Sequence, residues 1–328
     1  MNKFQHQHTA HCETGVMSSM LDYHGVQISE PMALGLSSSI AFAYLPFIKL
    51  NGLPLIAYRM PPRSVIKGLK KRLKLNLDYE RFTDPKKGMI ALDKQLDAGN
   101  IVGLQTSVYW LPYFPDDMRF HFNAHNLLVY AKKNNTYLIS DPVFEKPVSC
   151  STDELQKARF SRGALAPKGM MYFIDKPPKP VNYTKLIPLS IKSSARSLTA
   201  PIPIIGIRGI RFLANKLARL DRTMPDKKQQ ILFLGHIIRM QEEIGTGGAG
   251  FRYMYASFLQ ESATLMNNKL LEDASNMMTD VGDHWRNFAL HTVKMCKNRS
   301  HYDLRELSKL LHKCASEELK VWKLLKKI

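Results

Sequence analysis

The chain is organised around one stretch near its N-terminus, Ala10-His11-Cys12-Glu13-Thr14-Gly15-Val16-Met17-Ser18-Ser19-Met20-Leu21-Asp22-Tyr23-His24-Gly25. Apolar residues recur in it at helical spacing and Gly25 supplies a stop, so the pattern predicts a helix that begins near Cys12. Unpaired amide groups and the positive end of the helix dipole favour a thiolate there. The stretch predicts Cys12 as a nucleophile; the alternative is a small, buried apolar residue, the more common role of a free cysteine.

A second segment supplies the partners that a thiol nucleophile needs. His125 opens an apolar, strand-like run, Lys132-Lys133-Asn134-Asn135 reads as a turn, and the return strand 136–140 ends at Asp141-Pro142. A hairpin pairs the start of one strand with the end of the other, so we expect His125 and Asp141 to lie close together. Cysteine before a helix, then His and Asp on adjacent strands, is the order of a papain-like thiol site. The alternative is a surface histidine and an aspartate that merely ends a strand.

The motifs around these residues resemble the butirosin biosynthesis protein H family. The N-terminal domain of that family is similar to His11-Cys12-Glu13, Leu21-Asp22-Tyr23-His24-Gly25, the segment 28–36, Tyr109-Trp110-Leu111-Pro112-Tyr113 and the hairpin from His125 to Asp141-Pro142. The segment 245–256 resembles the helical domain of unknown function that commonly follows it.

This resemblance implies a papain-like fold and an activity. The family's namesake moves an acyl group from the phosphopantetheine thiol of an acyl carrier protein onto an amine. By resemblance, Cys12 is the nucleophile, His125 the base and Asp141 the residue that orients the base.

Some positions depart from the family pattern or leave a choice open. The family favours Asp before the Tyr-x-Leu-Pro segment, whereas this chain has Ser107, so a substrate contact at Ser107 and Tyr109 is an open expectation. Papain-like sites often place a glutamine before the cysteine as an oxyanion donor. The candidates for that position are Gln5 and Gln7, with His6 and His8 competing and His11 as a further polar residue.

The charge of the chain indicates an acidic partner. Lys and Arg number 47 against 28 Asp and Glu, which gives a net charge of +19 and calls for nucleic acid, anionic lipid or an acidic protein. No nucleic-acid-binding motif is visible, and acyl carrier proteins are acidic, so charge and resemblance agree. The candidate carrier-binding residues are Lys67, Lys70, Lys71, Arg72, Arg208 and Arg211.

Both basic stretches also have plainer explanations. A charge run such as 64–75 is usually a solvated helix face. The amphipathic stretch 201–222 is suited to packing within a helical domain, to peripheral contact with an anionic membrane, or to covering an acyl chain.

The cysteines and the termini indicate a reduced, soluble protein. Cys12, Cys150, Cys296 and Cys314 form no CxxC pair, and the histidines near Cys12 fit no metal-site spacing, so we expect no metal and no bound cofactor. There is no signal-like N-terminus and no apolar run of 18 residues, so we expect a cytoplasmic protein.

Composition divides the chain in two. Residues 1–176 mix early helices with later paired strands, which predicts an α+β, papain-like domain. Pro177-Pro178-Lys179-Pro180 opens a predicted linker, 177–203, and the remainder, 204–328, reads as a mostly helical domain. Its predicted helices cover 227–243, 249–266, 270–297 and 304–327.

Three functions remain open at this point. The first is an acyltransferase that passes an acyl group from a carrier protein, through acyl-Cys12, to an amine of a small molecule or a protein lysine. The second is a cysteine peptidase or amidase that uses the same residues with water as the acceptor. The third is a binding module that has kept the fold without the activity.

Overall fold

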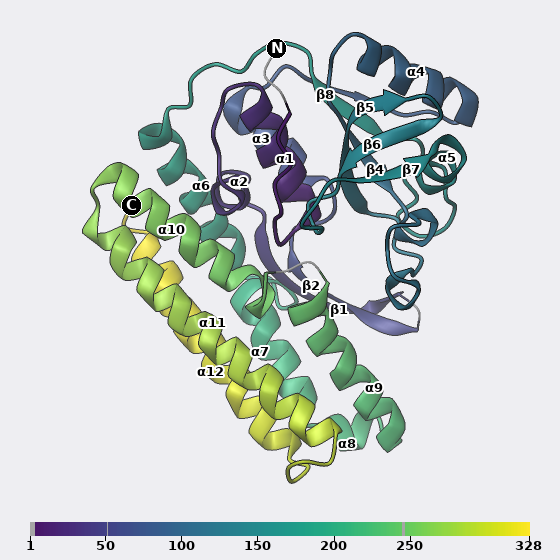
Figure 1. The fold of residues 1–328 in the computed structure, drawn as a ribbon. Coiled ribbons are helices and arrows are strands. Elements are labelled where there is room, and N and C mark those ends of the chain that lie inside the picture. Colours follow the sequence, from purple (N-terminus) through teal and green to yellow (C-terminus); the bar gives the residue numbers. More distant parts are fainter. Residues whose placement is uncertain (1–3, 51, 245–246) are drawn as a thin grey trace. The chain divides into compact units, whose positions relative to one another are not determined.

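The computed structural model describes residues 4–50, 52–244 and 247–328, and the chain divides into two compact units (Figure 1). Unit 1 consists of residues 1–33 and 65–181, and unit 2 consists of residues 34–64 and 182–328. The chain therefore passes between the units within helix α2 (Glu30–Leu36), at the start of helix α3 (Ser64–Leu73), and after residue 181.

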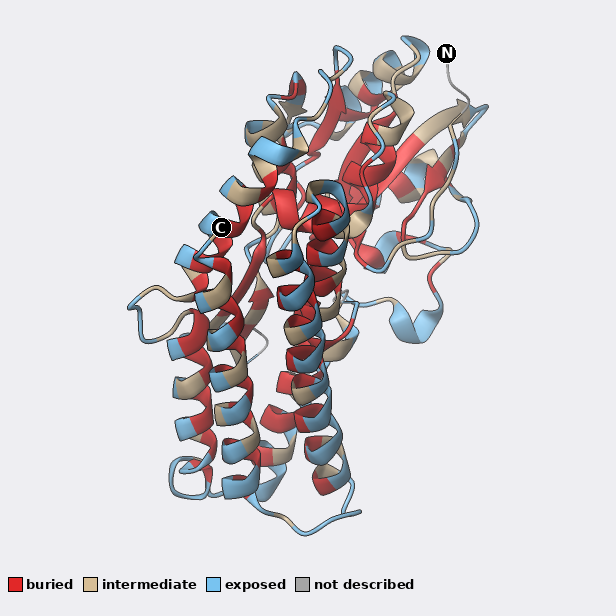
Figure 2. Cartoon of the chain, turned by 90° about the vertical axis from the view of Figure 1, so that its left-hand side faces the viewer, coloured by how far each residue is buried: buried red, intermediate tan, exposed pale blue. Residues whose placement is uncertain are grey.

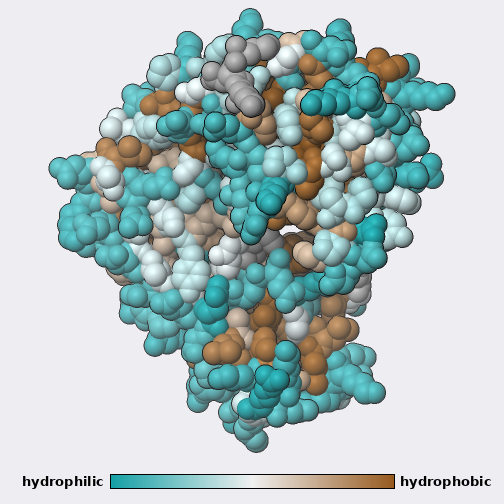
Figure 3. Space-filling view, in the orientation of Figure 1, coloured by the Kyte–Doolittle hydropathy of each residue, from teal (hydrophilic) through white to brown (hydrophobic). Residues whose placement is uncertain are grey.

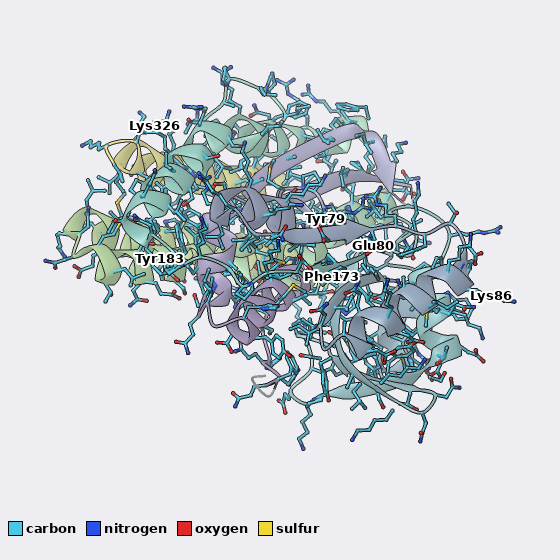
Figure 4. The ribbon with its side chains drawn as sticks, turned by 90° about the horizontal axis from the view of Figure 1, so that it is seen from above. Tyr79, Glu80, Lys86, Phe173, Tyr183 and Lys326 are labelled. Carbon is cyan, nitrogen blue, oxygen red and sulfur yellow. The ribbon has the colours of Figure 1, made fainter. Side chains whose placement is uncertain are left out.

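Unit 1 is built on a six-stranded antiparallel sheet. Its strands follow the spatial order β3 (Leu77–Glu80), β8 (Met171–Ile174), β4 (Val102–Thr106), β5 (His125–Lys133), β6 (Thr136–Ser140) and β7 (Val148–Ser151). Figure 4 labels Tyr79 and Phe173 on the paired strands β3 and β8. The predicted hairpin is confirmed as β5 and β6, with Asn134 in the left-handed conformation that its turn requires (φ 52°).

Helices cover both faces of this sheet. Helix α1 (Cys12–Tyr23) packs against β4 and β5 with fully buried apolar side chains such as Val16 and Met20. Helices α4 (Pro85–Asp97) and α5 (Thr152–Arg159) lie on the other side, where Leu92 and Leu155 share a core with Leu104 and Leu127 (Figure 1). The loop between β4 and β5 carries two short turns of 3₁₀ helix, η1 (Val108–Trp110) and η2 (Asp116–Met118).

Unit 2 combines one hairpin with long helices. The hairpin is β1 (Ile40–Leu50) with β2 (Leu53–Arg59). The helices are α6 (Tyr183–Leu198), α7 (Gly206–Leu217), α8 (Leu220–Thr223), α9 (Lys227–Ile238) with a π-turn η3 (Arg239–Glu243), η4 (Ala249–Phe251), α10 (Arg252–Met266), α11 (Lys269–Cys296) and α12 (Leu304–Leu325). Their apolar stripes are buried and their outer faces are exposed (Figure 2). The four predicted helices are confirmed within a few residues at their ends.

The core of unit 2 encloses one ion pair. Arg252 and Glu318 are both completely buried, and the Arg252 guanidinium lies 2.9 Å from Glu318 Oε1. The indole N–H groups of Trp285 and Trp322 also donate to the Glu318 carboxylate, each at 3.2 Å. Burying a charge pair costs little free energy only when its remaining donors and acceptors are hydrogen-bonded. Here the Glu318 carboxylate accepts four hydrogen bonds.

The compact units differ from the predicted domain boundaries. Residues 34–64, predicted as part of the first domain, cluster with the helices because Phe42 and Tyr58 pack on Trp285. Most of the predicted linker 177–203 is helix α6, which buries Ile187 and Ile191. Within the glycine-rich segment that resembles the second family domain, Gly245 and Thr246 lie outside the described residues.

Candidate active site

Cys12 is the first residue of α1. His11 is the N-cap, and its ring nitrogen Nδ1 accepts a hydrogen bond from the Thr14 amide at 3.3 Å. Cys12 is 7 % exposed and Glu13, Thr14 and Gly15 in the same turn are buried. The first amides of a helix have no partner within it, so the Cys12 sulfur lies at the end of α1 that carries partial positive charge.

A half-buried carboxylate fixes the segment that leads into Cys12. Glu30 at the start of α2 accepts hydrogen bonds from the amides of Ala10 (2.9 Å) and His11 (2.7 Å) and from the Thr14 hydroxyl (2.8 Å). Burial raises the pKa of Glu30, and these three bonds act in the opposite direction by favouring the carboxylate. Three bonds from one side chain hold the residues on either side of Cys12 in place.

A second carboxylate holds the same end of α1 from another direction. The fully buried Glu13 accepts from the backbone amides of Val65 (2.9 Å) and Ile66 (3.3 Å) in the first turn of α3. An anion is favoured at a helix N-terminus, so the start of α3 stabilises the Glu13 carboxylate. The first turns of α1 and α3 are thereby tied together.

The β5–β6 hairpin brings His125 and Asp141 into contact, as the sequence predicts. The distance between His125 Nε2 and Asp141 Oδ2 is 2.7 Å, and their side chains are 5 % and 0 % exposed. The other ring nitrogen of His125 remains for Cys12, whose side chain is near enough to raise the pKa of the imidazole. Thus Cys12, His125 and Asp141 form one continuous chain of contacts.

The charge state of His125 follows from these neighbours. Burial alone lowers the pKa of a histidine, but the Asp141 carboxylate, its hydrogen bond and the Cys12 side chain outweigh burial and raise the pKa of His125 to about 10. At neutral pH the ring is therefore a protonated imidazolium beside a sulfur atom and a carboxylate. This is the electrostatic state of an activated thiol site.

Aromatic side chains that the sequence did not indicate surround the His125–Asp141 pair. The Tyr113 hydroxyl donates to Asp141 Oδ2 at 2.9 Å, and the Phe114 ring lies edge-on to the His125 ring at 5.4 Å. Phe144 contacts both Tyr113 and Phe114. The resemblance included Tyr113 within a motif, but no pattern in the sequence indicated that it contacts Asp141.

The N-terminal segment runs beside the same strand end. The Thr9 amide donates to the Pro142 carbonyl at 2.7 Å, and the His6 ring contacts the Ser140 hydroxyl (2.7 Å) and the Phe144 carbonyl (2.9 Å). A Cβ atom at Gly15 would lie 2.0 Å from Thr9 Oγ1 and 2.7 Å from Pro142 Cβ. Glycine at position 15 therefore permits the first turn of α1 to approach the segment that follows Asp141.

The predicted oxyanion and substrate residues have different surroundings. The Gln7 side-chain amide donates a hydrogen bond to the Asp22 carboxylate at 3.2 Å, so this donor is already engaged. The Gln5 side chain is exposed. The His11 ring contacts the Thr14 hydroxyl at 2.9 Å. Ser107 is completely buried, and its hydroxyl has no hydrogen-bond partner among the residues that the structure describes. Tyr109 is 40 % exposed and stacks on His121.

The predicted carrier-binding residues are not equally free. Lys67 and Lys71 are exposed on α3, whereas the Lys70 ammonium donates to the Leu77 carbonyl (2.6 Å) and lies over the Tyr79 ring. Burial lowers the pKa of Arg72. On α7, Arg208 is exposed and Arg211 is half-buried. The face of the molecule seen in Figure 3 is mostly hydrophilic.

Two further observations concern metals and membranes. Within residues 4–50, 52–244 and 247–328, no three His, Cys, Asp or Glu side chains gather as they would around a metal ion. Over the same described ranges, no helix has the length and apolar character needed to cross a bilayer.

Comparison with known proteins gives two family matches that follow one another along the chain. Residues 11–142 match the model described as Butirosin biosynthesis protein H, N-terminal. Residues 153–325, more than half of the chain, match the Domain of unknown function (DUF4872). The family and the domain order expected from the sequence are confirmed.

The matches among solved structures include the following one. It is a C39-like peptidase from Bacillus anthracis, with 14 % sequence identity and a TM-score of 0.38, and the match covers 53 % of this chain and 96 % of the peptidase. Among curated proteins no relative is found.

Proposed function

Because the chain belongs to the family in which a butirosin biosynthesis protein H N-terminal domain precedes a DUF4872 domain, we propose that it is a papain-like cysteine acyltransferase. Its donor is an acyl group held as a thioester on the phosphopantetheine of an acyl carrier protein, and its acceptor is an amine. The observation that carries the proposal is the buried contact chain Cys12–His125–Asp141, with the pKa of His125 raised to about 10.

In the first half-reaction, the Cys12 thiolate attacks the thioester carbonyl carbon. A bond forms between Sγ and that carbon, and the bond from the carbon to the phosphopantetheine sulfur breaks. The protonated His125 gives its proton to the leaving sulfur, so the carrier departs as a thiol. In this proposal the backbone amide of Cys12, at the start of α1, stabilises the oxyanion.

In the second half-reaction, the amine attacks the acyl-Cys12 carbonyl. The neutral His125 takes a proton from the amine, an amide bond forms, and the bond to Cys12 Sγ breaks. Asp141 keeps the His125 ring oriented through both steps. The acceptor is an amine on a small molecule or on a protein lysine.

The charge distribution supports an acidic carrier as the donor. Unit 2 contains 27 of the 47 lysines and arginines but only 13 of the 28 acidic residues, so most of the net charge of +19 belongs to the helical unit. Such a surface attracts an acidic protein and accelerates its encounter with the chain. Arg208 and Arg211 on α7 are the first residues to test for this contact, together with Lys67 and Lys71.

Intact-protein mass spectrometry tests the proposal directly. The protein is mixed with a panel of acyl carrier thioesters, and we expect a mass increase equal to the acyl group, mapped to Cys12. Addition of amines should then discharge the adduct as an amide. Cys12→Ala should abolish the adduct, whereas Cys150→Ala, at a buried cysteine outside the contact chain, should retain it.

The same experiment separates the alternatives. An adduct that water discharges as quickly with or without amines identifies a hydrolase, the peptidase or amidase alternative. Absence of any adduct with every donor, together with an inert Cys12, leaves only the non-catalytic binding module.

A further inference from the structure

The carboxylate of Asp141 is held more firmly than a His–Asp pair alone requires. Its Oδ2 atom accepts two hydrogen bonds, from His125 Nε2 at 2.7 Å and from the Tyr113 hydroxyl at 2.9 Å. Its Oδ1 atom accepts from the Val143 amide at 3.3 Å. Both oxygens are therefore engaged, and the one that faces the imidazole carries a second donor.

We propose that Tyr113 is a positioning residue, which donates its hydroxyl to Asp141 Oδ2 and thereby fixes that oxygen against His125. A carboxylate that bonded only to His125 and the Val143 amide could rotate about its Cβ–Cγ bond and move Oδ2 away from the ring. A second donor on the same atom opposes that rotation. The inference rests on the proposed function only in naming His125 as the base; the contact itself does not depend on what the protein acylates.

The phenol is suited to this role because it stays neutral. Burial and the neighbouring Asp141 charge raise the pKa of Tyr113 well above its ordinary value, so its proton remains available to donate. A donor on the charged form of a carboxylate favours that form, which offsets the cost of burying Asp141 without solvent.

The surroundings fix the direction in which the Tyr113 hydroxyl points. Its ring packs edge-on against Phe144 at 5.2 Å and next to Phe114, which itself contacts His125. The loop that carries Tyr113 is anchored near both ends, because the Val108 amide donates to the Phe122 carbonyl at 3.1 Å and the Ser107 amide to the Ala158 carbonyl at 2.9 Å. The ring thus has little freedom to turn its hydroxyl away from Asp141.

The test is Tyr113→Phe, which removes only the hydroxyl. The readout is the pKa of His125, followed by NMR of histidines labelled at Cε1 and assigned by loss of the signal in His125→Gln. With Oδ2 no longer held, we expect the pKa of His125 to fall by about one unit.

Tyr137→Phe is the matched control. Tyr137 is also a buried tyrosine of unit 1 and donates to a carboxylate, Asp93 Oδ1, at 2.7 Å, but it does not contact the His125–Asp141 pair. The Tyr137→Phe variant should have the same His125 pKa as the unaltered protein. An unchanged His125 pKa in folded Tyr113→Phe would overturn the proposal, and so would an equal shift in Tyr137→Phe.

Two further measurements make the outcome independent of folding and of function. In the Asp141→Asn background, adding Tyr113→Phe should shift the His125 pKa no further, whereas a full additional shift would show that Tyr113 acts by another route. In the unaltered protein, proton NMR should detect a slowly exchanging phenol hydroxyl that moves in Asp141→Asn; its absence would count against the contact. None of these readouts needs a substrate, so a failed transferase assay leaves them unaffected.

Discussion

Among the single residues, Asp141 sets the state of the others around it. Burial lowers the pKa of His125, but the Asp141 carboxylate raises it by more. The resulting pKa is about 10, compared with about 6.5 for an ordinary histidine. The proton on His125 therefore stabilises the folded chain fully below about pH 6.5. This contribution is lost as the pH rises through about 10.

A pH series with His125→Ala tests this linkage. The free energy of unfolding should be larger for the unaltered protein than for the variant, and within the series this difference should be largest at pH 6.5. The excess should shrink by about 3–5 kcal/mol on going to pH 10.5, since one unit of pKa difference equals about 1.4 kcal/mol. Denaturant titrations at each pH measure it. His291→Ala, at an exposed histidine on α11, should show no such trend, and a constant difference for His125→Ala would contradict the raised pKa.

Among the secondary-structure elements, the position of α1 matters most, because that helix carries Cys12. Four contacts determine where its first turn lies: Glu30 from α2, Glu13 with the amides of α3, Thr9 with Pro142, and the close approach at Gly15. All four act within one turn of the sulfur. The reactivity of Cys12 therefore depends on backbone packing as well as on its charged neighbours.

Gly15→Ala should separate α1 from the strand end that carries Asp141. The added methyl would overlap Thr9 and Pro142, so the helix start must move, which should destabilise the fold by about 1–3 kcal/mol. Displacement of a reacting atom by about 1 Å lowers rates by about 100-fold, and we expect alkylation of Cys12 to slow by about 10–100-fold. Peptide mass spectrometry after iodoacetamide treatment gives the rate.

Gly235→Ala is the control for that substitution. Gly235 also lies in a helix, α9, but nothing comes within 4 Å of an added Cβ there. It should raise stability by about 0.5–1 kcal/mol, as alanine does in a helix, and leave the alkylation rate unchanged. If Gly15→Ala also left the alkylation rate unchanged, the close approach of Gly15 to Thr9 and Pro142 would not affect the reactivity of Cys12.

The sequence predicted those parts of the site that local pattern determines. A helix start at Cys12 and a hairpin from His125 to Asp141 follow from periodicity and turn residues within short windows. The contact from Tyr113 to Asp141 spans 28 residues across an irregular loop, and the bonds from Glu30 reach back 16 to 20 residues. Such side-chain contacts leave no periodic signal in the sequence.

The predicted linker shows a different limit. Ile187, Ile191 and Ala195 repeat every four residues and are buried along α6, so the helical pattern was present in the sequence. The prolines at 177, 178 and 180 just before it favoured a linker instead.

For the molecule as a whole, the order of the chain differs from the order of its compact units. Residues 34–64 lie between the two segments of unit 1 in sequence but belong to unit 2. There the hairpin buries Phe42 and Tyr44 against Trp285, Phe212 and Phe233. In the sequence, Cys12 therefore precedes the segment 34–64, and His125 and Asp141 follow it. The apolar side chains of that segment are covered by the helices of unit 2.

A chain that ends at residue 181 should therefore not behave as an independent domain. It would expose Phe42, Tyr44, Ile56 and Tyr58, all buried in the full chain, and an apolar face of that kind promotes aggregation. We expect residues 1–181 to associate in analytical ultracentrifugation, and the amides of 40–59 to exchange rapidly. Serine at the four positions should restore the monomer. A monomeric, protected 1–181 would instead support the boundary at 176 predicted from composition.

The position of residues 34–64 in the sequence, far ahead of the helices that cover them, also has a consequence during biosynthesis. A ribosome adds about 5–20 residues each second, and Trp285 follows Tyr58 by 227 residues, so the hairpin waits roughly 11–45 s for the ring that covers it. During that interval Cys12, His125 and Asp141 have all been made, while the hairpin between them in the sequence still exposes its apolar face. The nascent chain is therefore most in need of a chaperone in the middle of its synthesis.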